Sequence, residues 1–323
     1  MATSVEPPTA GPARRILLLL NPGAGQAAAL RHARRRIEEH PGLHLDLIVP
    51  DPGHQQTQYS QALAAVEAGV DAVVVCGGDG MVSAGVNLVA QRGIPLGIIP
   101  AGSGNDFARA AAIPRRYEAA LQRVLDALNR PERAVRAVDA LRLSLHTTHD
   151  GDASPRWAAN SINIGFDARV NQRANAQRRT PRQLRYLVAL AQEVPRFSSS
   201  TFEVQLDDAE KTALRSALVC VQNGPTIGGG IPLAPGARID DGWAEVSHVG
   251  PLSRPGLVAL FPLVMLRRHR WVKPLTTRRA RRLSITVPAG VPVFADGDEF
   301  LSGGADDQRV VVEVVAGAVQ LLG

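Results

Sequence analysis

The stretch AVVVCGGDG at residues 72–80 is a short apolar run that passes directly into a glycine-rich turn around one aspartate. A valine-rich run of this length is typical of a buried strand, and the residues after the turn have helical spacing. Glycines at a strand-to-helix turn let the backbone approach a phosphate chain closely and point its N–H groups at the phosphates. The stretch therefore predicts a phosphate-binding turn; the alternative is a plain turn in which Asp79 caps the helix.

Other apolar runs flank this stretch and begin roughly 23 to 29 residues apart, close to the length of one βαβ unit. Between the runs, apolar residues recur at helical spacing, and glycines supply the stops. We therefore expect a doubly wound α/β domain whose ligand lies at the carboxyl ends of the strands. The expected strands are Ile16–Leu20, Leu45–Val49, Ala72–Cys76 and Pro95–Ile99, and the expected helices are Ala27–Glu39, Gln56–Ala68 and Val82–Gln91.

After about Asp139 the pattern changes to many short strand-like runs, and this half is predicted to be mainly antiparallel β. The segments Arg182–Val194 and Leu257–Arg268 have convincing helical patterns. The expected strands are Leu141–His146, Trp157–Ile164, Phe202–Leu206, Ala217–Gln222, Trp243–Val249, Arg282–Val287, Val291–Ala295 and Val310–Val315.

Two further glycine turns follow strands of the predicted parallel sheet. Gly102, Ser103, Asn105 and Asp106 come directly after one strand, where small residues and a hydroxyl suit phosphates. Asn105 and Asp106 could orient metal-bound water or cap a helix. The first strand ends in the loop Asn21–Gly25 at the same sheet edge. Together the turns predict one nucleotide pocket.

The basic residues of the chain indicate which classes of partner and enzyme fit the sequence. There are 36 basic and 30 acidic residues, for a formal net charge of +6, which suits anionic partners. Lys211 and Lys273 are the only lysines, and neither lies in the Gly-Lys-Ser/Thr context of a Walker A loop, so a P-loop NTPase is excluded. The arginines are spread along the chain without a recognised nucleic-acid module, so we expect no nucleic-acid partner.

The N-terminal residues 1–14 are expected to form a disordered tail that is neither a secretory signal nor a transit peptide. Cys76 and Cys220 lie in valine-rich runs, which favours buried thiols in a reducing, cytoplasmic compartment. The apolar stretch Leu257–Leu266 is too short to span a bilayer. Because the basic and aromatic Arg267–Trp271 follows it, it suits either an interfacial helix or a helix packed on a sheet.

The chain resembles the diacylglycerol kinase catalytic domain family, which includes bacterial lipid kinases and sphingosine kinases. The resemblance is carried by the turns Asn21–Gly25 and Gly77–Gly80 and by the segment Pro95–Arg109. Further segments match the family's second-domain landmarks in order, namely Asn163–Ala168, Asn223–Pro225 with Gly228–Gly230, Ala234–Gly242 and Asp296–Asp298. The resemblance implies a nucleotide-binding α/β domain over residues 15–139, rejoined by 316–323, and a β-sandwich lipid-binding domain over 140–315.

The resemblance also implies the roles of particular residues. Asp79 and Asp106 would lie near the magnesium of ATP, and Asp241 with the carbonyls of Arg238 and Trp243 would hold a second, structural Mg²⁺. Asp298 would be the general base that takes the proton of the acceptor alcohol, with Asp296 or Glu299 able to share that role, and Asp79 would also act in catalysis. The residues expected to bind the nucleotide are Asn21, Pro22, Gly23, Ala24, Gly25, Gly77, Gly78, Asp79, Gly80, Met81, Ser83, Gly102, Ser103, Asn105 and Asp106.

Several positions depart from the family pattern. Met81 stands where a threonine is usual, Ser83-Ala84 replaces a polar pair, Gln26 replaces a lysine, and Asp298 replaces a glutamate. These changes remove contacts to phosphates, so a catalytically weak homologue is an alternative.

The resemblance implies an ATP- and Mg²⁺-dependent lipid kinase that phosphorylates the hydroxyl of diacylglycerol or a related lipid. Peripheral contact with the membrane is expected, and a homodimer is left open. A soluble small-molecule kinase of the NAD kinase type is a second interpretation because such enzymes also contain a GGDG turn, and a nucleotide-sensing protein without catalysis is a third. The SGNDF segment at residues 103–107 and the turn at Asp296–Asp298 favour the lipid kinases.

Overall fold

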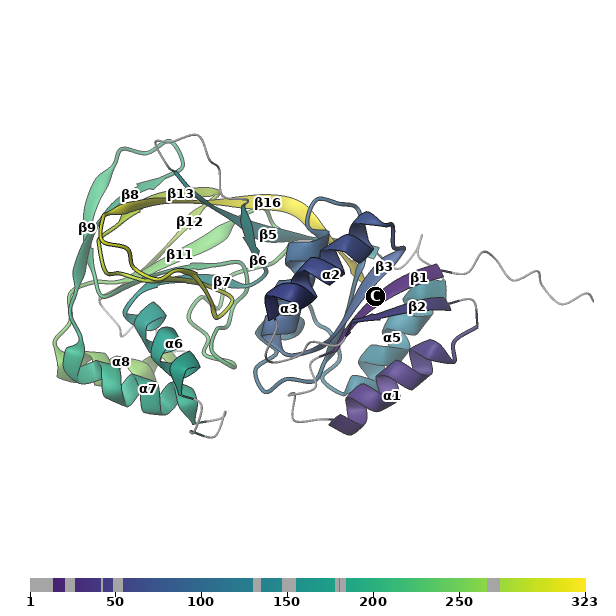
Figure 1. Cartoon of the computed structure of the whole chain (residues 1–323). Helices are drawn as coiled ribbons and strands as arrows, with labels where there is room; N and C mark the ends of the chain where they lie inside the picture. Colours follow the sequence, from purple (N-terminus) through teal and green to yellow (C-terminus); the bar gives the residue numbers. More distant parts are fainter. Residues whose placement is uncertain are drawn as a thin grey trace, which may run out of the picture.

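The N-terminal half of the computed structural model alternates strands and helices along the chain (Figure 1). Its elements are β1 (Arg14–Leu20), α1 (Ala27–Glu38), β2 (Leu43–Ile48), α2 (Gln55–Glu67), β3 (Ala72–Gly77), α3 (Asp79–Val89), β4 (Leu96–Pro100), α4 (Asp106–Ala110) and α5 (Tyr117–Asn129). The structure describes residues 14–20, 27–41, 43–48, 55–129, 135–146, 155–177, 180, 184–265 and 274–323.

Parallel strands in the order β2-β1-β3-β4 form the sheet of this half. Side chains of α1 and α5, among them Ile37 and Leu121, pack on one face, and side chains of α2 and α3, among them Val66 and Val86, pack on the other. Because helices cover both faces, β3 is buried along its whole length. The doubly wound α/β domain is therefore confirmed.

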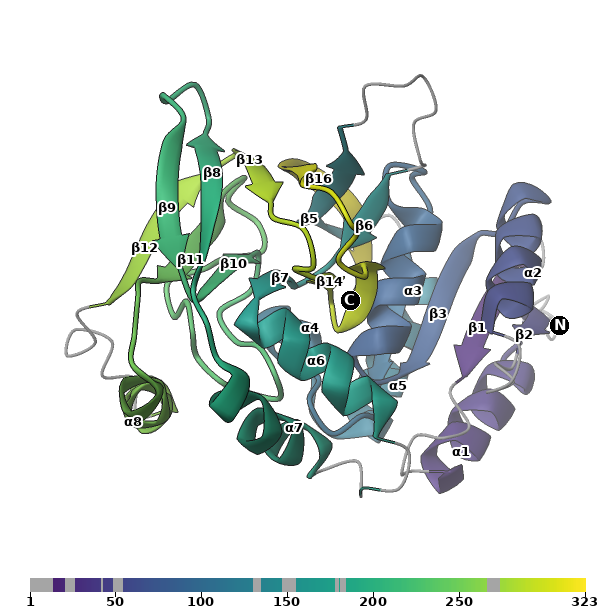
Figure 2. The ribbon, with the colours of Figure 1, turned by 60° about the vertical axis from the view of Figure 1, so that its left-hand side comes forward.

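The C-terminal half consists mainly of antiparallel strands, with helices gathered on one side (Figure 2). Its elements are β5 (Val135–Leu145), β6 (Arg156–Ala158), β7 (Ser161–Gly165), α6 (Phe166–Ala176), α7 (Arg185–Glu193), the 3₁₀ helix η2 (Val194–Arg196), β8 (Ser200–Leu206), β9 (Thr212–Ser216), β10 (Leu218–Gln222), β11 (Ala244–Val249), α8 (Arg254–Met265), β12 (Leu275–Ala280), β13 (Arg282–Val287), β14 (Val293–Ala295), β15 (Asp298–Leu301) and β16 (Gln308–Leu322).

Two sheets form the β-sandwich of this half. One has the order β12-β11-β10-β7-β14-β15, and all its pairs are antiparallel. The other contains β16, β13, β8 and β9, with β5 and β6 beside β16. Inward-facing side chains such as Ile164, Val221 and Ile285 form one apolar core between the sheets. The predicted antiparallel β-sandwich is confirmed.

The strands β5 and β16 pair with each other and pass together from the sandwich into the parallel sheet (Figure 1). Near its end β16 runs parallel to β4, with Leu321 opposite Leu96. The ladder between β5 and β16 is irregular between Val315 and Val319.

A buried carboxylate stabilises this irregularity. Asp139, which is 3% exposed, accepts hydrogen bonds from the backbone nitrogens of Gly317 at 2.9 Å and Gly242 at 2.7 Å. Both glycines have positive φ, +62° and +72°, a conformation that side chains disfavour. Asp139 therefore ties the connection between the domains to the turn that precedes β11.

The predicted single strand Trp157–Ile164 is divided between the two sheets, because β6 pairs with β5 and β7 pairs with β10. At the crossing, the backbone nitrogens of Ala159, Asn160 and Ser161 donate to the Asp296 carboxylate at 2.6, 2.9 and 2.9 Å. An apolar pattern cannot reveal this crossing, because the Asp296 carboxylate that binds the backbone between β6 and β7 comes from far along the chain.

The helix α6 was not predicted from the sequence. Polar residues such as Arg169, Gln172 and Arg173 are interspersed with its few apolar side chains, so the helical pattern of its sequence is weak. Within the described parts of the chain, no helix is long and apolar enough to cross a membrane.

Candidate active site

Two glycine turns meet at the carboxyl ends of β3 and β4. The backbone nitrogen of Ala101 donates to the Gly77 carbonyl at 2.8 Å. A Cβ atom on Gly102 would lie 2.4 Å from the Cα of Gly78, closer than real Cβ contacts, so glycine is required at this crossing. The predicted convergence of these two turns is therefore seen in the structure.

The loop after β4 is shaped by Asn105, which has the left-handed φ of 54°. Its side chain accepts a hydrogen bond from the Gly102 nitrogen at 3.1 Å and donates to the Gly102 carbonyl at 2.8 Å. Ser103 is exposed and lines a cavity of about 230 Å³, together with Arg109 and Arg115. The loop is thus held rigidly by its own amide side chain, with a hydroxyl and two guanidinium groups around an open space.

Asp79, the first residue of α3, points at the loop after β4. Its carboxylate accepts a hydrogen bond from the Phe107 nitrogen at 3.3 Å, and a Cβ on Gly104 would lie 2.7 Å from Oδ2. Burial raises the pKa of Asp79, and the negative charge of Asp106 raises it further, while the backbone N–H groups at the start of α4 act in the opposite direction.

Asp296 reaches the same region from the second domain. Its backbone has a φ of 50°, and its carboxylate holds the three N–H groups of residues 159–161. Its pKa is raised to about 6. Burial is the largest cause, the three N–H donors oppose the rise, and the charge of Asp79 adds to it. The charge of Asp79 in the GGDG turn therefore acts on the acidic turn near the C-terminus.

Asp298 and Glu299 begin β15, just after Asp296, and are more exposed to solvent than Asp296. Asp298 forms an ion pair with Arg156 at 3.0 Å, and 54% of its side chain is exposed. Partial burial raises the pKa of Asp298, and the Arg156 guanidinium opposes this rise. Glu299 is exposed and accepts a hydrogen bond from Gln172 of α6 at 3.1 Å.

The other residues predicted to bind the nucleotide differ in their burial and position. Met81 and Ser83 lie on the buried side of α3, 8% and 0% exposed, and Met81 is part of the apolar core. Gly80 follows Asp79 in the first turn of the helix. The loop Asn21, Pro22, Gly23, Ala24 and Gly25 lies outside the described residues.

The segment expected to hold a structural magnesium is occupied by an arginine. The Asp241 carboxylate pairs with Arg279 and accepts a hydrogen bond from the Trp243 nitrogen at 3.1 Å. Arg279 also lies 3.5 Å from Glu245, and its guanidinium is 5.3 Å from the centre of the Trp243 ring. The side chain of Arg238, whose backbone carbonyl was the expected ligand, pairs with Asp240. In this arrangement the donors do not fit a divalent ion, because a guanidinium already neutralises the carboxylate.

Sequence reasoning missed the residues that connect the two domains at this site. Thr226 and Asn160 are buried polar residues whose side chains bridge separate segments. The glycine run Gly228–Gly230 drew attention to the neighbouring segment, but nothing in the sequence distinguished Thr226 from other threonines. Among the described residues, no three acidic, histidine or cysteine side chains form a ready-made metal site.

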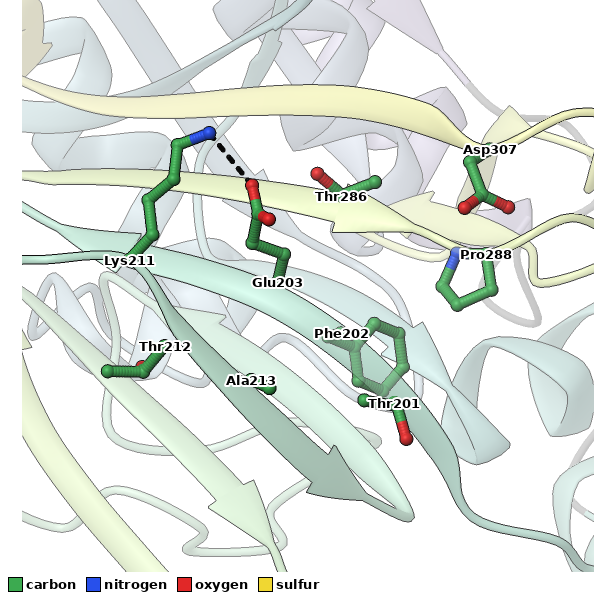
Figure 3. A pocket seen from close by; sticks show the side chains of 9 residues that line it. All are labelled: Thr201, Phe202, Glu203, Lys211, Thr212, Ala213, Thr286, Pro288 and Asp307. Carbon is green, nitrogen blue, oxygen red and sulfur yellow. Dashed lines mark hydrogen bonds and ion pairs between the residues drawn. The ribbon is translucent and has the colours of Figure 1, made fainter.

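A second hollow lies at the outer end of the sandwich, near β8, β9 and β13 (Figure 3). It has a volume of about 310 Å³, and its wall includes the ion pair between Lys211 and Glu203, 2.8 Å long. None of the residues that line it belongs to the glycine turns or to the acidic hairpin. We therefore restrict the candidate active site to the region between the domains.

Comparisons with known proteins fit this geometry. Residues 15–137 match the diacylglycerol kinase catalytic domain, and residues 160–323 match the YegS C-terminal NAD kinase beta sandwich-like domain. A diacylglycerol kinase from Mycobacterium tuberculosis is 33% identical over 287 residues, with 88% of each chain covered. The chain belongs to the diacylglycerol kinase family.

Further comparisons involve proteins that are more distant from this chain. A probable lipid kinase YegS-like protein from Stenotrophomonas maltophilia is 28% identical, with 80% of each chain covered. The crystal structure of a diacylglycerol kinase from Bacillus anthracis has a TM-score of 0.63 at 19% identity, covering 96% of both chains. Yeast NADH kinase shares the fold, with a TM-score of 0.59 at 13% identity over 99% of this chain and 88% of the other.

The arginine at the Asp241 turn leads to a stability prediction. Because Arg279 neutralises Asp241, addition of EDTA should leave the melting temperature of the wild-type protein unchanged. Arg279→Ala should lower the stability by about 1 kcal/mol, the scale of partly exposed ion pairs. Arg278→Ala, next to it on β12, is the matched control. A wild-type melting temperature that falls with EDTA and recovers with MgCl₂ would contradict this account.

Proposed function

We propose that this kinase transfers the γ-phosphoryl group of ATP, with Mg²⁺, to the hydroxyl of diacylglycerol or a related lipid. The observation that carries the proposal is the meeting of the GGDG turn with the glycine loop after β4, beside the Asp79 carboxylate, whose charge also raises the pKa of Asp296 from the second domain. A half-buried carboxylate beside a glycine-rich phosphate turn suits phosphoryl transfer to a neutral alcohol.

The glycine turns supply the nucleotide side of the site. The contact between Gly78 and Gly102 brings two stretches of backbone together without side chains between them. The absence of side chains lets a polyphosphate approach this backbone closely, and the exposed Ser103 hydroxyl adds a donor at the same edge. Arg115, at the wall of the neighbouring cavity, can balance the charge of the phosphates.

Asp296 is the residue we assign as the general base. Its pKa of about 6 leaves it ionised at neutral pH yet basic enough to accept a proton in the transition state. Its three N–H donors fix the direction of the carboxylate. Asp298, the residue favoured by sequence similarity alone, is engaged by Arg156 and more open to solvent, so we give it a supporting role in binding or orientation.

Asp79 also suits the Mg²⁺ that ATP carries. Magnesium in phosphoryl-transfer sites is held by one or two protein carboxylates, the phosphates and water. The Asp79 carboxylate, whose pKa is raised in part by the charge of Asp106, gains from a nearby cation, and this leaves Asp296 as the base. When bound, the ion would neutralise charge on the transferred phosphoryl group.

A lipid acceptor is supported by the family relatives and by exposed apolar groups near the helices of the second domain. Leu184, at the start of α7, is 48% exposed, and Val258 of α8 is 57% exposed. We propose that these helices contact the membrane surface peripherally while the acceptor enters the site. The fold shared with yeast NADH kinase makes a soluble nucleotide the acceptor to test against lipids.

The substitutions Asp79→Asn and Asp296→Asn should each lower kcat by at least about 100-fold, since they remove charge stabilisation and the proton acceptor. Asp298→Asn should lower it by less than about tenfold. Transfer of labelled phosphate from ATP to diacylglycerol, ceramide, sphingosine and NAD measures these effects. A greater loss in Asp298→Asn than in Asp296→Asn would overturn the assignment of the base, and transfer to NAD alone would overturn the lipid acceptor.

The activity should also depend on pH in a defined direction. The base must be ionised to accept a proton, so kcat/KM should fall as the pH is lowered through about 6. The fall should stay at the same pH in Asp298→Asn, because Asp296 sets it. A profile that remains flat down to pH 5, or one whose acid limb moves in Asp298→Asn, would contradict the assignment.

A further inference from the structure

Asp106 belongs to the nucleotide-side domain, yet two of its hydrogen-bond donors come from the second domain. It is 4% exposed. Its Oδ1 accepts a hydrogen bond from the Thr226 hydroxyl at 2.7 Å, and its Oδ2 accepts one from the Gly229 nitrogen at 2.6 Å. The segment between β10 and β11 therefore binds directly to the start of α4.

Arg109 completes the cluster from the next turn of α4. Its Nη1 donates to Asp106 at 2.6 Å and to the Thr226 hydroxyl at 3.2 Å, while Nη2 donates to the Gly104 carbonyl at 2.7 Å. One guanidinium thus joins the nucleotide loop, the buried acid and the second domain. The Asp106 carboxylate is paired with a guanidinium and accepts hydrogen bonds on both oxygens, so it is a poor candidate for a magnesium ligand.

The backbones also meet closely at this contact. A Cβ on Gly104 would lie 3.4 Å from the Cα of Gly229, and Gly228–Gly230 all have positive φ, from +58° to +114°. A loop of this shape can lie against the nucleotide loop without side chains between them. The two domains therefore touch at the phosphate-binding backbone itself.

The same contacts continue to the proposed base. The Thr226 carbonyl accepts a hydrogen bond from the Asn160 side chain at 2.9 Å. The Asn160 backbone nitrogen in turn donates to Asp296 at 2.9 Å. A chain of short contacts thus runs from the loop at Gly104, through Arg109 and Thr226, to Asp296.

We propose that Asp106, Arg109 and Thr226 form an interdomain latch that sets the position of the nucleotide loop relative to Asp296. This inference rests on the proposed function and adds to it a positioning role for residues outside the phosphate turns. The latch acts on the alignment of the phosphoryl donor and the base, because misplacement of reacting groups by about 1 Å can cost about 100-fold in rate. Loss of the latch should therefore reduce kcat more than it weakens substrate binding.

Thr226→Val tests the latch, because it removes the hydroxyl and nearly preserves the shape of the side chain. It should lower kcat by about 10- to 100-fold, with KM for ATP and for the lipid changed less than about threefold. Thr226→Ser, which keeps the hydroxyl, should restore most of kcat. Thr212→Val on the edge strand β9 is the matched control and should behave as the wild type. A wild-type kcat in Thr226→Val, or equal losses in the Ser and Val variants, would overturn the latch.

A double-mutant cycle tests whether the latch acts through the base. In an Asp296→Asn background, Thr226→Val should reduce kcat by less than about twofold, because the group it positions is absent. Full additivity of the two losses would show that Thr226 does not position Asp296.

Hydrogen exchange separates failure of the latch from failure of the proposed function, because it needs no substrate. The Gly229 amide, which donates to Asp106, should exchange at least about tenfold faster in Thr226→Val than in the wild type or Thr226→Ser. If the protein phosphorylates no lipid but this difference appears, the proposed function fails and the latch remains as a structural contact without the proposed role. If lipid is phosphorylated but exchange is unchanged, the latch fails.

Discussion

The contact between the Asp296 carboxylate and three consecutive backbone N–H groups is the constraint on which the rest of the site depends. It lies where the chain leaves one sheet of the sandwich and enters the other, so the same bonds define the fold and aim the carboxylate. A buried carboxylate without such donors would be costly. The donors compensate the charge only in part, and burial together with Asp79 keeps the pKa raised.

Three acidic residues gather between the domains, and their partners divide them into two kinds. Asp106 is balanced by Arg109 and by donors from the second domain, so its charge holds the domains together. Asp79 and Asp296 have backbone donors and each faces another carboxylate, which leaves them available for a cation or a proton. On this division we propose a structural role for Asp106 and a chemical role for Asp79 and Asp296.

The sequence was sufficient for features that depend on neighbouring residues. Strand, glycine turn and helix follow each other at residues 72–89 and 95–110, so the turns at Gly78 and Gly102 and their shared sheet edge could be predicted. The antiparallel sandwich could be predicted from its short alternating runs. Each of these signals lies within a few dozen residues of chain.

Contacts between distant segments could not be predicted in the same way. The family resemblance favours Asp298 over Asp296 because Asp298 stands where the family has its glutamate base, but the orientation of each side chain depends on Arg156 and on the turn at Asn160. Similarly, the pairing of Arg279 with Asp241 joins β12 to a turn before β11, and Thr226 meets Asp106 across the domain boundary. Such contacts depend on the tertiary structure and not on the local pattern of the sequence.

The site depends on Asp79 lying near enough to Asp296, across the domain boundary, for its charge to act on that carboxylate. Carbon-detected NMR of protein labelled at the aspartate carboxyl carbons measures it directly, with the Asp296 signal assigned by its loss in Asp296→Asn. The account predicts a pKa of about 6 for Asp296 in the wild type and a lower value in Asp79→Asn, because the charge that raises it is removed. A pKa near the ordinary 3.8, or one that is unchanged in Asp79→Asn, would contradict it.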